Sequence, residues 1–219
     1  MPQPTLVKAL AGLGMLALPL TSAAAGLGEK IAKQGNGKGA AACQTCHGAD
    51  GSGNGAAGYP RLAGMNADYM VKQLKDLSGD SRQNAIMKPM ASALTAEERQ
   101  AVADYYADME PPKKAPNADG DADKIAAGEK IAQDGLWRKG VPACTSCHGP
   151  GGQGVGASFP GLAGQHANYI TNQINDWQAD KRSNDPNQLM DVVAERLTKE
   201  EAAAAAAYFA SLPAAPSQD

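Results

Sequence analysis

The chain has few large aromatic side chains: ten of its 219 residues are Phe, Trp or Tyr. Hydrophobic residues make up 43% of the sequence, but many of them are Ala. The length suits one large domain or two small ones. Two domains of about 90 residues with so few bulky side chains would have thin hydrophobic cores. An apolar cofactor in each domain would supply the missing bulk.

Basic residues do not outnumber acidic ones. The sequence has 20 Lys and Arg against 23 Asp and Glu, which gives a formal net charge of −3. No basic stripe is interleaved with aromatic residues, and such a stripe is the usual footprint of a nucleic-acid-binding protein. We therefore expect no nucleic-acid partner.

Long apolar runs are missing beyond the N-terminus. There, Lys8 is the sole charge in the first 28 residues, an apolar stretch covers residues 9–20, and Ala23–Ala25 offer a small-residue cleavage site. This pattern predicts a signal peptide over residues 1–25 and export to the periplasm. The apolar stretch is short for a membrane span and contains Pro19. The alternative to a signal peptide is an uncleaved N-terminal anchor. The sequence leaves open whether the mature protein associates loosely with a membrane.

Cysteine is scarce too, and all four cysteines fall in two copies of one pentapeptide, at residues 43–47 and 144–148. Both copies fit C-x-x-C-H, the attachment pattern for c-type haem. Two thiols add to the haem vinyl groups, and the adjacent His becomes an axial iron ligand. Redox dithiols, zinc half-sites or two disulfides would leave the repeated His unexplained. The sequence predicts two haem c groups, held by these residues: Cys43, Cys46, His47, Cys144, Cys147 and His148.

The two halves repeat at an offset of about 100 residues, which indicates duplicated domains rather than a solenoid. The blocks at residues 28–32, 43–47, 59–64 and 94–98 return at 128–132, 144–148, 159–164 and 197–201. Between the repeats, Pro, Lys, Asp and Gly predominate, which is linker composition. We expect a signal peptide, two cytochrome-like domains, a linker and a tail in this order: residues 1–25, 26–110, 111–123, 124–212 and 213–219.

Each repeat shows the same predicted elements and no convincing strand, so the predicted fold class is all-α. Helices are expected over residues 27–34, 66–78 and 95–109 of the first repeat and 123–134, 166–179 and 198–212 of the second. The last helix of each repeat begins with a Thr-x-x-Glu capping box. A Gly-rich loop follows each haem motif, and a polar loop is expected to carry Met87 or Met190.

A His-ligated haem iron has a second axial position, which Met or His fills in electron carriers and which is open in enzymes. The second half has a single methionine, Met190, eight residues before the capping Thr of its last helix, and Met87 occupies the same place in the first half. We predict Met87 and Met190 as the axial ligands, with Met90 as the competitor in the first half. His166 does not obey the repeat and is expected near a helix N-terminus.

Two further pairs of residues are candidates for contacts around the haems. A ligating imidazole donates its other N–H to a fixed acceptor. Pro60 and Pro160 follow the two histidines by 13 and 12 residues, so their carbonyls could accept that bond; simple turn prolines are an equal alternative. Arg82 and Arg182 precede the methionines and could pair with haem propionates, with solvated surface arginine as the alternative.

One C-x-x-C-H per domain, a downstream Pro-x-Leu-x-Gly, a Met loop and a final helix resemble class I cytochrome c. Two such domains in tandem, with Gly-Gln-His-Ala-x-Tyr at residues 164–169, resemble the diheme cytochrome c4 family over residues 26–212. The resemblance implies two His/Met haems with closely approaching edges, and carbonyl acceptors at Pro60 and Pro160. It also implies electron delivery to a terminal oxidase, with a quinol-oxidising complex as the expected donor.

The predicted function is electron transport in a respiratory chain without substrate chemistry. One alternative is the cytochrome subunit of a dehydrogenase that oxidises sulfide or an alcohol. A diheme peroxidase is another. A peroxidase needs an open iron and nearby acid–base groups. The chain has three histidines, and two of them are predicted to ligate iron, so few groups are left for acid–base chemistry.

Overall fold

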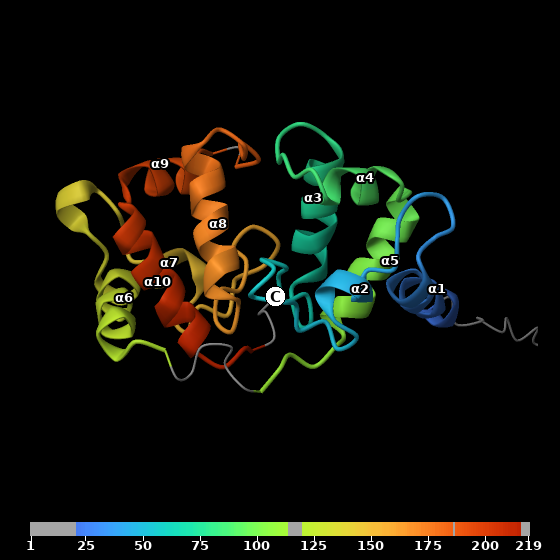
Figure 1. Ribbon diagram of the computed structural model, residues 1–219, viewed down its shortest axis with the longest axis horizontal. Coiled ribbons are helices and arrows are strands. Elements are labelled where there is room, and N and C mark those ends of the chain that lie inside the picture. Colours follow the sequence, from blue (N-terminus) through green and yellow to red (C-terminus); the bar gives the residue numbers. More distant parts are fainter. Residues whose placement is uncertain (1–20, 114–119, 186, 216–219) are drawn as a thin grey trace, which may run out of the picture.

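The computed structural model describes residues 21–113, 120–185 and 187–215. These residues form two helical lobes side by side, one for each repeat (Figure 1). The helices of the first domain are α1 (Thr21–Gln34), α2 (Gln44–His47), α3 (Ala67–Ser78), α4 (Met87–Ser92) and α5 (Ala96–Ala107). Those of the second are α6 (Ala122–Asp134), the 3-10 turn η1 (Trp137–Lys139), α7 (Thr145–His148), α8 (Ala167–Gln178), α9 (Leu189–Arg196) and α10 (Lys199–Ser211).

The all-α prediction is confirmed, and within the described residues extended backbone pairs only at isolated bridges. The predicted polar loop around each methionine is wrong, because the chain there forms the short helices α4 and α9. Side-chain oxygens start both helices. Asn84 Oδ1 accepts hydrogen bonds from the N–H groups of Ile86 and Met87, at 3.1 and 2.9 Å, and Asp185 Oδ2 accepts one from Met190 N–H.

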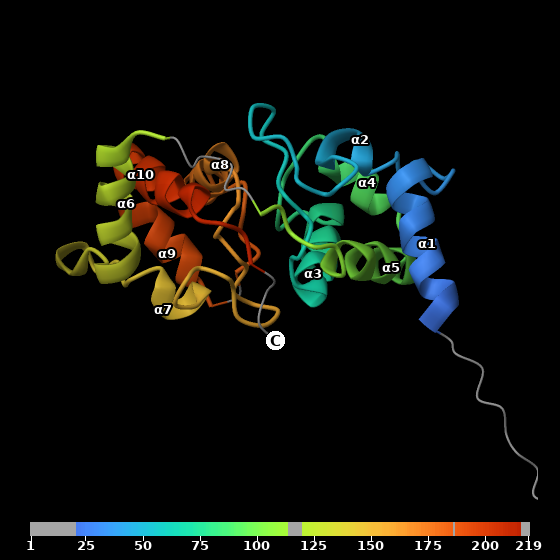
Figure 2. The ribbon, with the colours of Figure 1, turned by 90° about the horizontal axis from the view of Figure 1, so that it is seen from below.

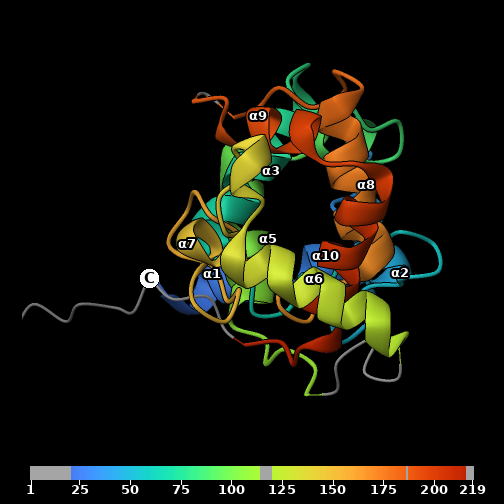
Figure 3. The same ribbon diagram turned by 90° about the vertical axis from the view of Figure 1, so that its left-hand side faces the viewer.

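In each domain the first helix crosses the last one at very close range. Figure 3 shows α6 running across α10, and α1 packs against α5 in the same way. The contact depends on a glycine in the first helix. A Cβ on Gly28 would lie 2.0 Å from Ala101 O, and a Cβ on Gly128 would lie 1.9 Å from Ala204 O. The two backbones therefore touch where any larger residue would push them apart.

The cores are thin, as the composition predicted. Half of the buried hydrophobic residues in the described chain are Ala, and α10 alone buries six of them. The largest side chains that are fully buried are Phe209, Ile31 and Val141. Alanine buries little apolar surface, so each domain gains little from its own side chains.

Both last helices begin with the predicted capping box. In α10, Thr198 Oγ1 accepts a hydrogen bond from Glu201 N–H at 3.2 Å, and the Glu201 carboxylate accepts one from Thr198 N–H at 2.8 Å. Lys139 also donates to the Glu201 carboxylate, at 2.6 Å. Thr95 and Glu98 form the same box at the start of α5.

This capping box predicts an acid-sensitive contribution to stability. The hydrogen bond from Lys139 and the one from Thr198 hold the pKa of Glu201 below its ordinary value. The contribution is therefore complete above the unfolded-state pKa of about 4.3 and is lost as the pH falls through the lower folded-state value. In thermal denaturation, Glu201→Gln should be less stable than the wild type at pH 7 by up to about 1 kcal/mol, since the side chain is still partly exposed to solvent. The difference in stability should disappear below about pH 4.3. An equal difference in acid would show that the Glu201 carboxylate does not make this contribution.

The two domains meet along a buried polar contact that involves Arg61. Its backbone N–H donates to Gln165 Oε1 at 2.9 Å, and Gln165 Nε2 donates back to Arg61 O at 3.0 Å. The Arg61 guanidinium donates across the interface to Gly164 O and Ala163 O, at 3.3 and 3.2 Å. Burial lowers the pKa of Arg61 to about 10, so it stays charged at neutral pH. Figure 2 shows the second domain against the first with α1 and α6 at opposite ends.

Two predicted segments fall largely outside the described residues. The predicted signal peptide covers residues 1–25, of which 21–25 belong to α1, and the predicted tail is described only to residue 215. The predicted linker is described at 111–113 and 120–123. Among the helices of the described residues, none is long and apolar enough to cross a membrane.

Candidate haem-binding sites

Each C-x-x-C-H motif forms a single helical turn, α2 in the first domain and α7 in the second. Cys43 and Cys144 take the N-cap positions, and the second cysteine of each motif follows three residues later on the same side of the turn. All four cysteines are free and half-buried. Burial raises the pKa of the Cys43 thiol, and that of Cys144 to about 11, so these two thiols are protonated at neutral pH. Each turn thus presents two thiols from one short segment.

The histidine that ends each motif is buried and held by one backbone carbonyl. His47 Nδ1 lies 3.0 Å from Pro60 O, and His148 Nδ1 lies 2.7 Å from Pro160 O. A carbonyl oxygen accepts but cannot donate, so Nδ1 carries the proton and Nε2 keeps its lone pair for a metal. Burial lowers the pKa of both imidazoles, and the bond to the carbonyl opposes this shift. The rings are therefore neutral, the form that ligates iron.

The two methionines predicted as ligands lie at equivalent places, at the start of α4 and of α9. Both Met87 and Met190 are half-buried. Met190 packs against the apolar cluster of the second domain, which includes Ile174 and Trp177. The competitor in the first domain, Met90, accepts a hydrogen bond on Sδ from Ala41 N–H at 3.4 Å.

The remaining candidates lie where the two domains meet. His166 is the N-cap residue of α8, as expected from the sequence, and its Nε2 lies 2.9 Å from Ser52 O of the other domain. Arg82 and Arg182 are 9% and 5% exposed, so the surface-arginine alternative is wrong for both. Their pairing with haem propionates stays a prediction.

The comparisons with known proteins agree with two cytochrome c domains. Residues 31–105 match the family "Cytochrome C oxidase, cbb3-type, subunit III", and residues 125–213 match the family "Cytochrome c". A solved structure, the reduced recombinant cytochrome c4 from Pseudomonas stutzeri, is 31% identical and superposes with a TM-score of 0.74, covering 87% of this chain and 97% of that one. The chain belongs to the diheme cytochrome c4 family.

Two other relatives of this cytochrome carry more specific names. The "Thiosulfate dehydrogenase electron acceptor" of Stutzerimonas stutzeri is 47% identical over 204 residues, which are 93% of this chain and 94% of that protein. The solved structure of thiosulfate dehydrogenase (TsdBA) from Marichromatium purpuratum is 40% identical, with a TM-score of 0.80, over 86% of this chain and 40% of that longer chain. Family membership makes this cytochrome an electron-transfer protein rather than an enzyme, with two covalently bound haem c groups.

The side chains of this cytochrome fit haem c on grounds besides the motifs. Tyr106 Oη and Trp177 Nε1 are buried and have no hydrogen-bond partner in the described part of the chain. Tyr106 packs in a cluster with Cys43, and Trp177 in a cluster with Cys144. A buried donor without a partner costs about 1–3 kcal/mol, and a haem carries two carboxylates that can accept hydrogen bonds. When bound, the haem supplies an iron that cycles between two oxidation states.

Sequence reasoning missed the residues that join the two domains. Arg61 and Gln165 form the central contact, and both stand where the repeat breaks: the equivalent residues are Gly161 and Met65. These breaks were a usable signal. At both positions one domain has the side chain that makes the contact, and the other has a residue that could not make it.

Proposed function

We propose that this cytochrome accepts electrons from a thiosulfate-oxidising dehydrogenase and passes them to a terminal oxidase. The observation that carries the proposal is the 47% identity, over almost the whole length, to a protein named as the electron acceptor of thiosulfate dehydrogenase. The similarity to part of the longer thiosulfate dehydrogenase chain TsdBA supports the same pairing. The donor is then a dehydrogenase rather than the quinol-oxidising complex expected from the sequence.

Both irons take His and Met in this proposal, through His47 and Met87 in the first domain and His148 and Met190 in the second. The free Nε2 of each buried histidine supports the first ligand. For the second ligand in the first domain, Met90 is disfavoured because its sulfur already accepts a hydrogen bond from Ala41. Six-coordinate irons exclude substrate chemistry, and thioether ligation raises the reduction potential so that electrons flow toward a strong oxidant.

The predicted signal peptide supports a periplasmic location, where c-type haem is attached in bacteria. The two motifs and the predicted export belong together, because haem is attached to such motifs outside the cytoplasm. The donor and acceptor would then meet this cytochrome on the same side of the membrane.

The proposal is tested by mixing the oxidised cytochrome with thiosulfate and the thiosulfate dehydrogenase of Stutzerimonas stutzeri, whose own acceptor is the 47% identical relative. We expect the haem absorption of both domains to change to the reduced form within the turnover time of the enzyme. Thiosulfate without the enzyme is the control. Reduction by a quinol-oxidising complex, with none by the dehydrogenase, would contradict the proposal and restore the donor expected from the sequence.

A further inference from the structure

The two domains also meet through a pair of equivalent arginines. Arg82 and Arg182 face each other across an isolated antiparallel bridge. Gln83 N–H donates to Lys181 O, and Ser183 N–H donates to Ser81 O, both at 2.7 Å. The bridge therefore pairs the same stretch of the two repeats and brings two like charges into one buried place.

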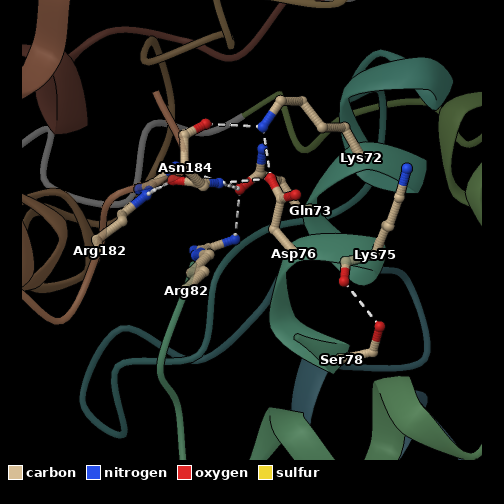
Figure 4. A network of polar contacts seen from close by, with 8 residues as sticks. All are labelled: Lys72, Gln73, Lys75, Asp76, Ser78, Arg82, Arg182 and Asn184. Atoms are coloured by element: carbon tan, nitrogen blue, oxygen red, sulfur yellow. Dashed lines mark hydrogen bonds and ion pairs between the residues drawn. The ribbon is translucent and has the colours of Figure 1, made fainter. Parts of the chain in front are cut away.

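Both guanidinium groups bind the same two side chains, one from each domain (Figure 4 shows Gln73 of this pair). Arg82 donates to Gln73 Oε1 at 2.9 Å and to Gln173 Oε1 at 2.6 Å. Arg182 donates to these oxygens at 3.2 and 3.0 Å. Arg82 also donates to Tyr169 Oη at 2.9 Å. Each arginine thus reaches from its own domain into the other.

All of these acceptors are neutral, so the positive charge of the pair is not cancelled by a carboxylate bonded to it. Asp76 accepts instead from Lys72 and from Asn184 Nδ2. Burial raises the pKa of Asp176, which lies near both arginines. The other charged groups that contact the pair or its partners, or act on Asp176, are Lys72, Lys181 and Asp76.

The arginine pair lies beside the apolar clusters that pack around the two haem motifs. The Arg182 guanidinium lies 3.9 Å from the centre of the Trp177 ring, and Trp177 shares an apolar cluster with Cys144 and Met190. On the other side, Gln73 lies in α3, whose Met70 packs in a cluster with Cys43.

We propose that Arg82 and Arg182 form one shared cationic site that raises the reduction potentials of both haems. Reduction removes one positive charge from a haem, so a nearby fixed cation stabilises the reduced form. A charge buried away from water acts over a longer distance than one at the surface. Because the pair is buried where the two domains meet, between the clusters that contain Cys43 and Cys144, each arginine should act on both haems. The proposal rests on the two haems and not on the identity of the donor.

The test is a spectroscopic redox titration of the purified holoprotein and of Arg82→Gln and Arg182→Gln. We expect each single substitution to lower the equilibrium constant for reduction of both haems by up to about tenfold, the order of magnitude for removing one unit charge from a partly buried site. A shift confined to the haem of the substituted domain, or no shift in either haem, would overturn the proposal.

Two matched variants separate charge from structure. Arg82→Lys loses the planar fork but keeps the charge at a pH low enough to protonate the buried amine, so there its two reduction steps should stay close to those of the wild type. Gln165→Ala removes a different contact between the domains and leaves the arginines in place, so it should shift neither step. If either variant moves both potentials as far as Arg82→Gln does, the cause is the geometry of the interface and the shared-charge proposal is wrong.

Discussion

Met190→Ala is expected to abolish half of the weak near-infrared absorption of the oxidised protein, because that absorption comes from methionine bound to ferric haem. Met190 packs in the same apolar cluster as Cys144, at the start of α9. Alanine leaves the sixth position of the second iron without its sulfur ligand. The loss should also lower the potential of that haem by the order of 0.1 V or more, since axial ligands set haem potentials over about 0.8 V. The other haem should be unaffected.

The first domain supplies the matched variants for this experiment. Met87→Ala should remove the other half of the absorption, whereas Met90→Ala should remove none, because the Met90 sulfur accepts a hydrogen bond from Ala41 instead. If Met90→Ala removes the band and Met87→Ala does not, the ligand of the first haem is Met90. A wild-type protein without any such absorption would overturn methionine ligation in both domains.

Gly128→Val is expected to destabilise the second domain by about 3 kcal/mol or more, close to the limit of what overpacked sites cost. The nearest atoms to a new Cβ are the backbone O and C of Ala204, at 1.9 and 2.5 Å, and a backbone cannot move aside as a flexible side chain can. Helix propensity alone would favour replacing a glycine inside α6. The close crossing of α6 and α10 therefore makes the substitution destabilising despite the gain in helix propensity. Denaturant unfolding, followed by haem absorption, measures the effect.

Gly79→Ala is the control for this substitution. Gly79 is exposed after α3, and a Cβ there would approach its neighbours no closer than 3.6 Å, which is ordinary contact. Gly28→Val should repeat the effect in the first domain, because the crossing of α1 and α5 is equally close. An unfolding midpoint for Gly128→Val equal to that of the wild type would show that the helices can separate without cost.

The sequence by itself determined the features that depend on short spacing. Two cysteines and a histidine within five residues define a haem motif wherever the chain goes, and a Thr three residues before a Glu makes a capping box within one helical turn. The duplication also paired Met87 with Met190. The sequence could not show that these methionines begin helices. The side chains of Asn84 and Asp185 accept hydrogen bonds from nearby backbone N–H groups, and such residues do this in turns as well as at helix starts.

Only the tertiary structure decided where the arginines lie. From the sequence, Arg82 and Arg182 were candidates to pair with haem propionates, with solvated surface arginine as the alternative; the structure buries them against each other because the two domains dock at that point. Arg61 and Gln165 stand 104 residues apart and meet in the same interface. No local pattern encodes a contact at that separation, since periodicity records which face of an element is buried and not what covers it. The two haem motifs were thus readable in the chain, and the link between the two haem domains was not.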